Sequence, residues 1–369
     1  MTTTEPVGVV GALLPSASPL ALLHADGTAV PGSPLTLPHD DVLLDLHRKM
    51  VVGRRFDTQA TALTKQGWLA VYPSSRGQEA CQVGAVAALD GDDWLFPTYR
   101  DSVALLTRGV DAVATLTLFR GDWHLGYDPY VYRVAPQCTP LATNTLHAVG
   151  LARAACLKGE DTVALVLLGD GATSEGDTHE ALNFAAVWKA PVVFLVQNNG
   201  YAISVPVAQQ SAAPSLAHKG IGYGVPSVLV DGNDAAAVYS VVREAVTAAR
   251  AGGGPVLIEA LTYRVEPHTN ADDHTRYRDP DEVRHWLTRD PVERLERHLT
   301  DRGLLDDVRL ESVRGEGEAL AAALRTRMHA ERTADPSGLF THVYAEPTAT
   351  LREQQAALLS REAEDGESA

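Results

Sequence analysis

Asp170 and Asn199 each follow an apolar stretch of the chain, and their side chains could bind a cation together. Asp170 lies in the string Gly-Asp-Gly, and Asn199 ends the string Gln-Asn-Asn. Carboxylate and amide oxygens are hard ligands that suit Mg²⁺, which usually completes its octahedral shell with water and phosphate oxygens. Gly169 and Gly171 would let the backbone approach a phosphate closely. These residue types therefore predict a magnesium site that holds a diphosphate.

The segments around these residues are predicted to form a β-α-β unit. Residues 163–168 and 191–196 are continuously apolar, as in strands buried on both faces of a parallel sheet. Residues 175–188 between them are predicted to be helical. In a right-handed β-α-β unit the carboxyl ends of both strands open onto one crevice, so Asp170 and Asn199 can converge there.

Together the two motifs resemble the GDG…NN signature of thiamine diphosphate enzymes. In that family the Asp, the second Asn and a following backbone carbonyl hold Mg²⁺, which implies Asp170, Asn199 and Tyr201 here. The resemblance also implies an α/β fold of the transketolase type, a parallel sheet with helices on both faces. A plain strand-turn-helix would explain the Gly-Asp-Gly string alone, but not the Asn-Asn pair after the second strand. In this part of the chain the residues expected to touch the cofactor are Gly169, Asp170, Gly171, Ala172, Asn199, Tyr201 and Ile203.

A second motif contains a tyrosine and an arginine that suit phosphate. The string Ser-Arg-Gly-Gln-Glu-Ala from Ser75, and the segment 93–101 with Tyr99 and Arg100, resemble alpha subunits of 2-oxo acid dehydrogenases. In that family the Tyr-Arg pair contacts the cofactor diphosphate, which fits a guanidinium fork beside a phenolic donor. The local alternatives are a helix N-cap at Ser75 and a surface arginine in a loop.

Two loop histidines are the candidate catalytic residues. His124 lies in a Gly- and aromatic-rich loop without periodicity, and His268 lies in segment 264–278, which is rich in His, Arg and Asp. By resemblance, His124 faces the substrate channel, whereas His268 contacts the cofactor and the reaction intermediate. Solvated loop histidines are the alternative for both. Thr269 stands where mammalian mitochondrial members carry a phosphorylated Ser, so kinase control is not expected.

Residues 139–144 form a candidate potassium loop. In branched-chain members of the family the equivalent string binds K⁺ and places an apolar residue beneath the cofactor, which implies Leu141 for that residue here. The potassium ligands implied are Thr139, Thr143 and Asn144. Asn144 departs from the family pattern, in which Gln is commoner at this position.

The composition argues against a nucleic-acid surface and favours a cytoplasmic protein. The 369 residues include 31 Lys and Arg against 47 Asp and Glu, a net charge of −16 at pH 7, which is the wrong sign for a phosphate backbone. No apolar run approaches the ~18 residues of a membrane span. Cys81, Cys138 and Cys156 lack metal-ligand spacing, which favours a reducing compartment. No Lys or Arg precedes Arg48, unlike a secretory or mitochondrial signal, so a bacterial cytoplasmic enzyme is expected.

Three segments are predicted along the chain. Residues 1–38, rich in Pro, Gly, Ser and Thr, form an irregular arm. Residues 39–345 form the thiamine diphosphate-binding α/β domain with its C-terminal helices, and residues 346–369 form a helical acidic tail. The family resemblance covers about residues 40–345.

The resemblance implies the alpha subunit of the first, decarboxylating component of a 2-oxo acid dehydrogenase complex. The expected partners are a beta subunit, in an assembly of two alpha and two beta subunits, and a lipoylated transacylase. In this family the carboxylate that activates the cofactor pyrimidine lies on the beta subunit. The expected substrate is 3-methyl-2-oxobutanoate or a related branched-chain 2-oxo acid, with pyruvate as the alternative.

Two further alternatives belong to other classes of protein. One is a subunit that holds the cofactor without turning it over, and the presence of His124 and His268 weighs against it. The other is a stand-alone thiamine diphosphate lyase, which would need a second complete α/β domain.

Overall fold

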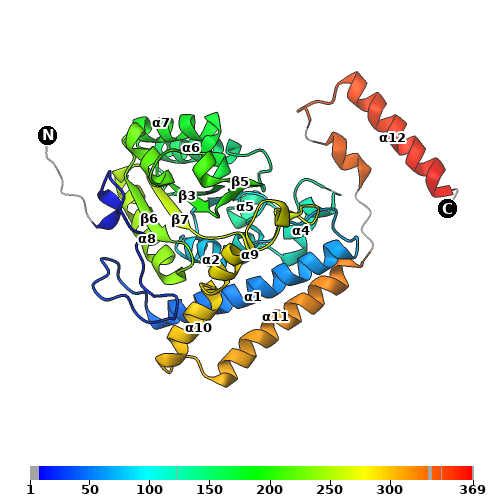
Figure 1. Cartoon of the computed structure of the whole chain (residues 1–369). Helices are drawn as coiled ribbons and strands as arrows, with labels where there is room; N and C mark the ends of the chain where they lie inside the picture. Colours follow the sequence, from blue (N-terminus) through cyan, green and yellow to red (C-terminus); the bar gives the residue numbers. More distant parts are fainter. Residues whose placement is uncertain (1–7, 122, 331–334, 342, 368–369) are drawn as a thin grey trace. The chain divides into compact units, whose positions relative to one another are not determined.

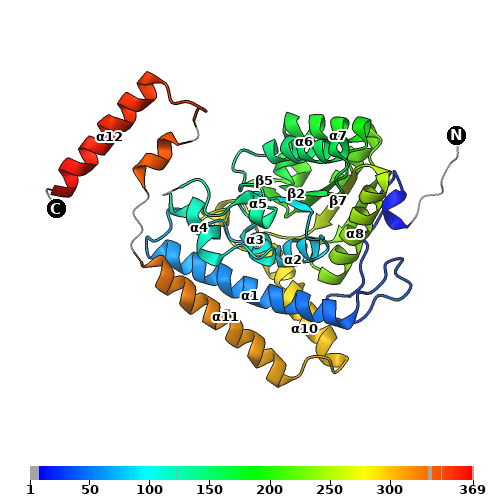
Figure 2. The same cartoon turned by 180° about the vertical axis from the view of Figure 1, so that it is seen from behind.

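The computed structural model describes residues 8–121, 123–330, 335–341 and 343–367. The chain divides into two compact units, Met1–Arg327 and Met328–Ala369. This division falls before the boundary predicted at residue 345. The division of the chain into the three predicted segments remains a prediction. Figures 1 and 2 show the first unit from opposite sides, with a central sheet between two groups of helices.

The sheet has five parallel strands. In spatial order they are β1 (Trp94–Phe96), β2 (Ala164–Gly169), β3 (Val192–Asn198), β7 (Val256–Leu261) and β6 (Ser227–Asp231). The register sets Gly169 beside Gln197 and Asn198 beside Leu261. The carboxyl ends of neighbouring strands therefore meet along one edge of the sheet, where α/β folds bind ligands.

The strands are apolar at successive positions because both faces of the sheet are covered. In β2, Leu165 and Leu167 pack into the core on one face, whereas Val166 and Leu168 pack into a second core on the other. None of the four side chains is exposed. Since alternate side chains of a strand point to opposite faces, a strand between two helical layers favours apolar residues at successive positions.

Helices lie on both faces of the sheet (Figures 1 and 2). One face carries α6 (Thr143–Lys158) and α7 (Gly176–Trp188), and the other carries α2 (Glu79–Ala87) and α8 (Ala235–Ala248). An outer helix, α1 (Asp40–Lys65), packs against α2. The other helices up to the second unit are α3 (Ser102–Thr107), α4 (Ala112–Arg120), α5 (Pro129–Tyr132), α9 (Pro280–Leu287), α10 (Pro291–Asp301) and α11 (Asp307–Met328).

Short elements connect the sheet to its loops. The hairpin of β4 (Tyr201–Ala202) and β5 (Val205–Pro206) follows β3 directly. The single-turn helix η2 (Gly171–Ser174) follows β2, and η4 (Leu216–Tyr223) packs against β6 and β7. Further short helical segments are η1 (Val9–Gly11), η3 (Val207–Gln209), η5 (Ala249–Gly253) and η6 (His274–Arg276).

The bounds of α1 follow from its sequence. Asp40 and Asp41 in the first turn complement the positive end of the helix dipole, and Met50 and Phe56 belong to its fully buried stripe. Gly67, just after the helix, has a φ of 81°, a conformation that glycine adopts without strain.

The predicted α/β class is confirmed, with a parallel sheet and helices on both faces. The predicted β-α-β unit corresponds to β2, α7 and β3. The sequence pattern does not predict β1, because three residues are too few to show a period.

The described part of the N-terminal arm packs on its own chain. Leu20 of the arm pairs with Val230 of the edge strand β6. The backbone N–H groups of Leu22 and Leu23 both donate to the Asp234 carboxylate at 2.7 Å. The arm therefore covers a sheet edge whose backbone groups would otherwise be open to pairing.

The second unit is helical where it is described. It contains η7 (Pro336–Phe340), which contacts α12 (Ala349–Glu367). Asp335 begins η7 by accepting a hydrogen bond from the Ser337 backbone N–H. Among the described residues of both units, no helix combines the length and apolar composition that crossing a bilayer requires.

Candidate functional site

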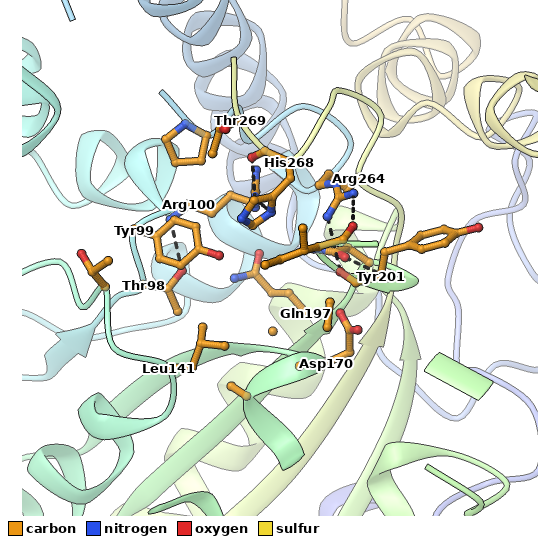
Figure 3. A pocket seen from close by; sticks show the side chains of 18 of the residues that line it. Thr98, Tyr99, Arg100, Leu141, Asp170, Gln197, Tyr201, Arg264, His268 and Thr269 are labelled. Carbon is orange, nitrogen blue, oxygen red and sulfur yellow. Dashed lines mark hydrogen bonds between the residues drawn. The ribbon is translucent and has the colours of Figure 1, made fainter. Parts of the chain in front are cut away.

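A cavity of about 610 Å³ opens at the carboxyl edge of the sheet (Figure 3). Its walls come from the segments after β1, β2, β3 and β7, and from residues between α1 and α2. All residues predicted to bind the cofactor line it, namely Tyr99, Arg100, Leu141, Gly169, Asp170, Gly171, Ala172, Asn199, Tyr201, Ile203 and His268. The fold thus brings together residues that lie far apart in the sequence.

Asp170 supplies the single carboxylate of the predicted magnesium set. Its side chain is buried, and Gln210 Nε2 donates to Oδ2 at 2.7 Å. Burial raises the pKa of Asp170, and hydrogen bonds from Gln210 and from the backbone oppose that shift. A buried carboxylate whose side-chain donor is a neutral amide gains from a bound cation, so Asp170 fits Mg²⁺.

Asn199 and Tyr201 present the other two predicted oxygens. Asn199 Nδ2 donates to Gln78 Oε1 at 3.0 Å, while Asn199 Oδ1 accepts from the Tyr201 backbone N–H at 3.3 Å. The Tyr201 carbonyl accepts from Arg264 Nη1 at 3.4 Å. A carboxylate, an amide oxygen and a carbonyl are the hard ligands that Mg²⁺ prefers, and the ligand assignment remains a prediction.

The two glycines of the Gly-Asp-Gly string differ in what surrounds them. A Cβ on Gly171 would lie 2.7 Å from the Ala202 Cβ, so the hairpin packs too closely for any other residue there. A Cβ on Gly169 would meet nothing within 4 Å. Close packing therefore explains why residue 171 is a glycine. Gly169 lines the cavity, and the space beside it leaves room for a ligand to approach the backbone.

Amide side chains at the base of the cavity orient one another. Asn199 donates to Gln78, Gln78 Nε2 donates to Gln197 Oε1 at 3.0 Å, and Gln197 Nε2 donates to Asp101 Oδ1 at 2.7 Å. Each amide accepts through oxygen and donates through nitrogen, so the chain of bonds determines the orientation of all three. The sequence-based prediction omits Gln78 and Gln197, although both stand inside the strings that indicate the site.

Arg100 and His268 bind each other across the cavity wall (Figure 3). Arg100 Nη1 donates to the Ser74 carbonyl at 3.0 Å, and Nη2 donates to both His268 Nδ1 and the His268 carbonyl at 2.9 Å. Because a guanidinium has no acceptor, His268 Nδ1 must accept, and the neutral ring carries its proton on Nε2.

His268 is uncharged at neutral pH. Burial, followed by the charges of Arg100 and Arg264, lowers the pKa of His268 to about 4, and Asp272 opposes this shift. His268 can therefore donate a hydrogen bond through Nε2, but its ring does not take up or release a proton near pH 7. These surroundings favour a hydrogen-bond donor role for His268, and its predicted contact with the cofactor remains a prediction.

A hydrogen-bond network around Arg264 holds the loop that carries His268 in place. Arg264 Nη2 donates to the Ile203 carbonyl at 2.7 Å and to the Tyr277 hydroxyl at 2.8 Å, and Tyr277 donates to Asp272. Asp272 also accepts from the His268 backbone N–H at 2.8 Å. The sequence-based prediction omits Arg264, which lines the cavity, although it begins the segment rich in His, Arg and Asp.

Ile203 is strained in the turn of the β4–β5 hairpin. Its φ of 57° lies in the left-handed region, which a β-branched residue rarely adopts. Its side chain lines the cavity and is 56% exposed, and its carbonyl is held by Arg264. The position of this apolar side chain is therefore maintained against a local conformational cost.

His124 is an exposed residue of the loop that follows α4. Its side chain is exposed and its ring packs against Trp123, with centroids 5.0 Å apart. His124 is not among the described residues that line the cavity, although the neighbouring Phe119 at the end of α4 is. The proposed role of His124 remains a prediction.

The candidate potassium residues occupy two environments. Thr139 lines the cavity, whereas Thr143 Oγ1 donates to Asp177 Oδ2 at 3.2 Å. Asn144 Nδ2 faces three backbone carbonyls, those of Leu167 at 2.9 Å, Phe96 at 3.3 Å and Pro97 at 3.5 Å. An amide nitrogen, not an amide oxygen, therefore points at these carbonyls, and the potassium assignment remains a prediction.

Ser75 is not a helix cap. The helix α2 begins at Glu79, and its N-cap residue is Gln78, without a side-chain hydrogen bond. Ser75 Oγ instead donates to the Arg100 carbonyl at 2.7 Å. The capping alternative is wrong because the local sequence pattern cannot show that a long-range acceptor competes for the hydroxyl.

Comparison with protein families matches residues 47–333 to the Dehydrogenase E1 component family, and the chain belongs to this family. The family implies thiamine diphosphate as the cofactor. For an alpha subunit it implies a beta subunit and a transacylase as partners.

Relatives agree on the type of subunit. The chain is 48% identical over 362 residues to the 3-methyl-2-oxobutanoate dehydrogenase subunit alpha of Mycobacterium tuberculosis, which covers 97% of this chain and 95% of the relative. It is 38% identical over 318 residues to the pyruvate dehydrogenase E1 component subunit alpha of Staphylococcus aureus, covering 85% of each. For the Acholeplasma laidlawii protein of that name the identity is 37% over 318 residues, 85% of this chain and 92% of the relative. The predicted alpha subunit of a 2-oxo acid dehydrogenase is confirmed.

Proposed function

We propose that this alpha subunit acts in the oxidative decarboxylation of a branched-chain 2-oxo acid of the 3-methyl-2-oxobutanoate class, and that its cavity holds the diphosphate of thiamine diphosphate with Mg²⁺. The observation that carries the proposal is the set of side chains around the cavity. One buried carboxylate, Asp170, lies on a wall that also contains the guanidinium groups of Arg100 and Arg264. Two guanidinium groups that can donate to phosphate oxygens, beside a buried carboxylate that can hold the metal, suit a metal-bound diphosphate.

Each group has a defined task in this proposal. Asp170, Asn199 and the Tyr201 carbonyl would hold Mg²⁺ through oxygen. Arg100 and His268 Nε2–H would donate to phosphate or substrate oxygens at neutral pH. Leu141, Ala172 and Ile203 are among the apolar residues of the cavity wall and would pack against the organic part of the cofactor and exclude water. When bound, the cofactor supplies the carbanion stabilisation that decarboxylation of a 2-oxo acid requires.

The proposal includes assembly with partners. The family resemblance places the carboxylate that activates the cofactor pyrimidine on a beta subunit, so the complete site would form between chains, in an assembly of two alpha and two beta subunits. The acyl group would then pass to a lipoyl group of the transacylase, and His124 is the residue proposed to serve that transfer. A cytoplasmic location accompanies this proposal, in line with three cysteines that are free thiols in the structure, Cys81, Cys138 and Cys156.

The branched-chain substrate is favoured by the relatives. The identity is 48% with the M. tuberculosis subunit and 38% with the S. aureus subunit, whose names state 3-methyl-2-oxobutanoate and pyruvate respectively. Pyruvate remains the second candidate because the motifs that line the cavity are common to both groups.

The substrate is tested on the chain assembled with its beta subunit. Decarboxylation of 3-methyl-2-oxobutanoate and of pyruvate is followed with an artificial electron acceptor at saturating thiamine diphosphate and Mg²⁺. We expect kcat/KM to favour the branched substrate by about 10-fold or more, the range in which a hydrophobic pocket distinguishes one or two methyl groups. A preference for pyruvate would establish the second candidate, and no turnover of either acid would favour a non-catalytic subunit.

A further inference from the structure

Asp57 is a buried carboxylate on α1, outside the residues that line the cavity. Its Oδ1 accepts from the Tyr72 hydroxyl at 2.8 Å and from the Ser75 backbone N–H at 2.7 Å, and its Oδ2 accepts from the Ser74 hydroxyl at 2.6 Å. The side chain is 4% exposed. Three donors from one short segment therefore converge on a single carboxylate and hold that segment against α1.

The segment that Asp57 holds also holds Arg100. The Ser74 carbonyl accepts from Arg100 Nη1 at 3.0 Å, and Ser75 Oγ donates to the Arg100 carbonyl at 2.7 Å. Arg100 in turn fixes His268 through Nη2. A continuous series of hydrogen bonds thus joins α1 to two residues of the cavity wall.

The carboxylate of Asp57 is unfavourable for the fold. Burial raises the pKa of Asp57 to about 6 in spite of its three hydrogen bonds, and the nearby Glu79 adds to the rise. Replacing a buried charged group with a neutral one commonly increases the stability of a protein. When the charged group supports a functional site, the same replacement lowers activity.

From these contacts we infer that Asp57 is a positioning residue, which fixes the segment 72–75 so that Arg100 and His268 present their donors to the cofactor diphosphate. This inference rests on the proposed function, in which Arg100 binds that diphosphate. The ionised side chain can accept all three donors, whereas an amide would turn its NH₂ group toward one of them. Loss of the charge therefore loosens Arg100 without removing any group from the cavity.

The test compares cofactor affinity with stability. Binding of thiamine diphosphate in the presence of Mg²⁺ is measured by calorimetry on the full chain assembled with its beta subunit, and thermal unfolding is recorded for the same samples. Asp57→Asn is expected to weaken binding by about 10- to 100-fold, the usual effect of losing a residue that orients a ligand group. The Tm of Asp57→Asn is expected to change no more than the Tm of the control variant described below, so that only the loss of affinity distinguishes Asp57 from a purely structural buried carboxylate.

Asp234→Asn is the matched control. Asp234 is a fully buried carboxylate with a raised pKa that also accepts three hydrogen bonds, but these come from the N-terminal arm and from α8. Its replacement is expected to leave the affinity for thiamine diphosphate unchanged. An affinity loss in Asp57→Asn no larger than in Asp234→Asn would overturn the inference.

A double variant tests whether Asp57 acts through Arg100. Asp57→Asn combined with Arg100→Ala should bind no more weakly than Arg100→Ala alone, whereas additive losses would overturn the inference. If Arg100→Ala binds like the wild type, the proposed cofactor role of Arg100 fails; if it binds weakly while Asp57→Asn is unaffected, only the role of Asp57 fails. Should Asp57→Asn not fold, Tyr72→Phe removes one donor alone, and unchanged affinity in that variant would count against the inference.

Discussion

Asp170 is subject to two opposite influences. Burial favours its neutral form, as the raised pKa shows, whereas a metal ligand must be ionised. A bound Mg²⁺ would resolve this conflict by supplying the counter-charge that the hydrogen bond from neutral Gln210 does not. Metal and cofactor binding should therefore depend strongly on this one charge.

The first prediction concerns the metal ligands. Asp170→Ala should lower the affinity for Mg²⁺ and thiamine diphosphate by about 100-fold or more, because it removes the one charged ligand, and Asn199→Ala should lower it less. Calorimetry on the assembled enzyme measures both. Glu175→Ala is the matched control, since Glu175 is a cavity carboxylate outside the predicted metal set. Unchanged affinity in Asp170→Ala would place the metal elsewhere.

The second prediction separates the two histidines. His268 lines the cavity, so His268→Ala should reduce decarboxylation followed with an artificial acceptor by about 100- to 1,000-fold, the usual effect of removing one preorganised hydrogen-bond donor. His124 is exposed and outside the cavity wall, so His124→Ala should spare that assay and reduce only transfer to lipoyl. Equal losses of both activities in His124→Ala would contradict the proposed division, and circular dichroism of each variant controls for folding.

At the scale of elements, α1 connects the outer helical layer to the cavity. The helix packs against α2, and its one buried carboxylate with three donors fixes the segment that follows it. The hairpin after β3 is a second such element, because Arg264 holds two of its carbonyls, those of Tyr201 and Ile203. Hydrogen bonds to α1 and to the hairpin thus determine how residues of the cavity wall are oriented.

The third prediction is the effect of Asp57 on stability as the pH changes. The pKa of Asp57 is raised from 3.8 to about 6 in the folded chain, so the folded state binds more protons than the unfolded state between these values. Its contribution to the free energy of unfolding therefore decreases as the pH rises from about 4 to about 6, by about 3 kcal/mol in total. Relative to the wild type, Asp57→Asn should gain stability over this range.

Urea unfolding of both proteins at several pH values measures that difference. Asp26→Asn is the control, because hydrogen bonds from Thr28 lower the pKa of this exposed carboxyl, and it should not gain stability over the same range. A difference between Asp57→Asn and the wild type that does not change with pH would show that Asp57 titrates normally.

At the scale of the whole molecule, the chain provides one part of a larger enzyme. The family implies a beta subunit, and the cavity of this chain is lined by groups suited to the diphosphate and its metal. The fourth prediction is that the purified chain alone has no measurable 2-oxo acid decarboxylation and that adding its beta subunit restores it. Turnover is measured with and without the partner at equal alpha-subunit concentration, and robust turnover by the isolated chain would contradict the shared site.

The sequence by itself determined the class of fold, the family and about half of the residues that line the cavity. Continuous apolar stretches indicate β2 and most of β3, because strands covered on both faces are rich in apolar side chains. Polar residues directly after such strands must then meet at one edge of the sheet, so the sequence alone places Asp170 and Asn199 in one site. These inferences succeed because they depend on local periodicity and on a topological rule.

Only the tertiary structure decided how the site residues are oriented. The Arg100–His268 hydrogen bond joins residues 168 positions apart and fixes the histidine tautomer, which no local pattern encodes. The same holds for Gln210 on Asp170 and for the exposure of His124 outside the cavity wall. Hydrogen-bond partners and burial depend on which distant segments pack together, and those contacts exist only once the chain has folded.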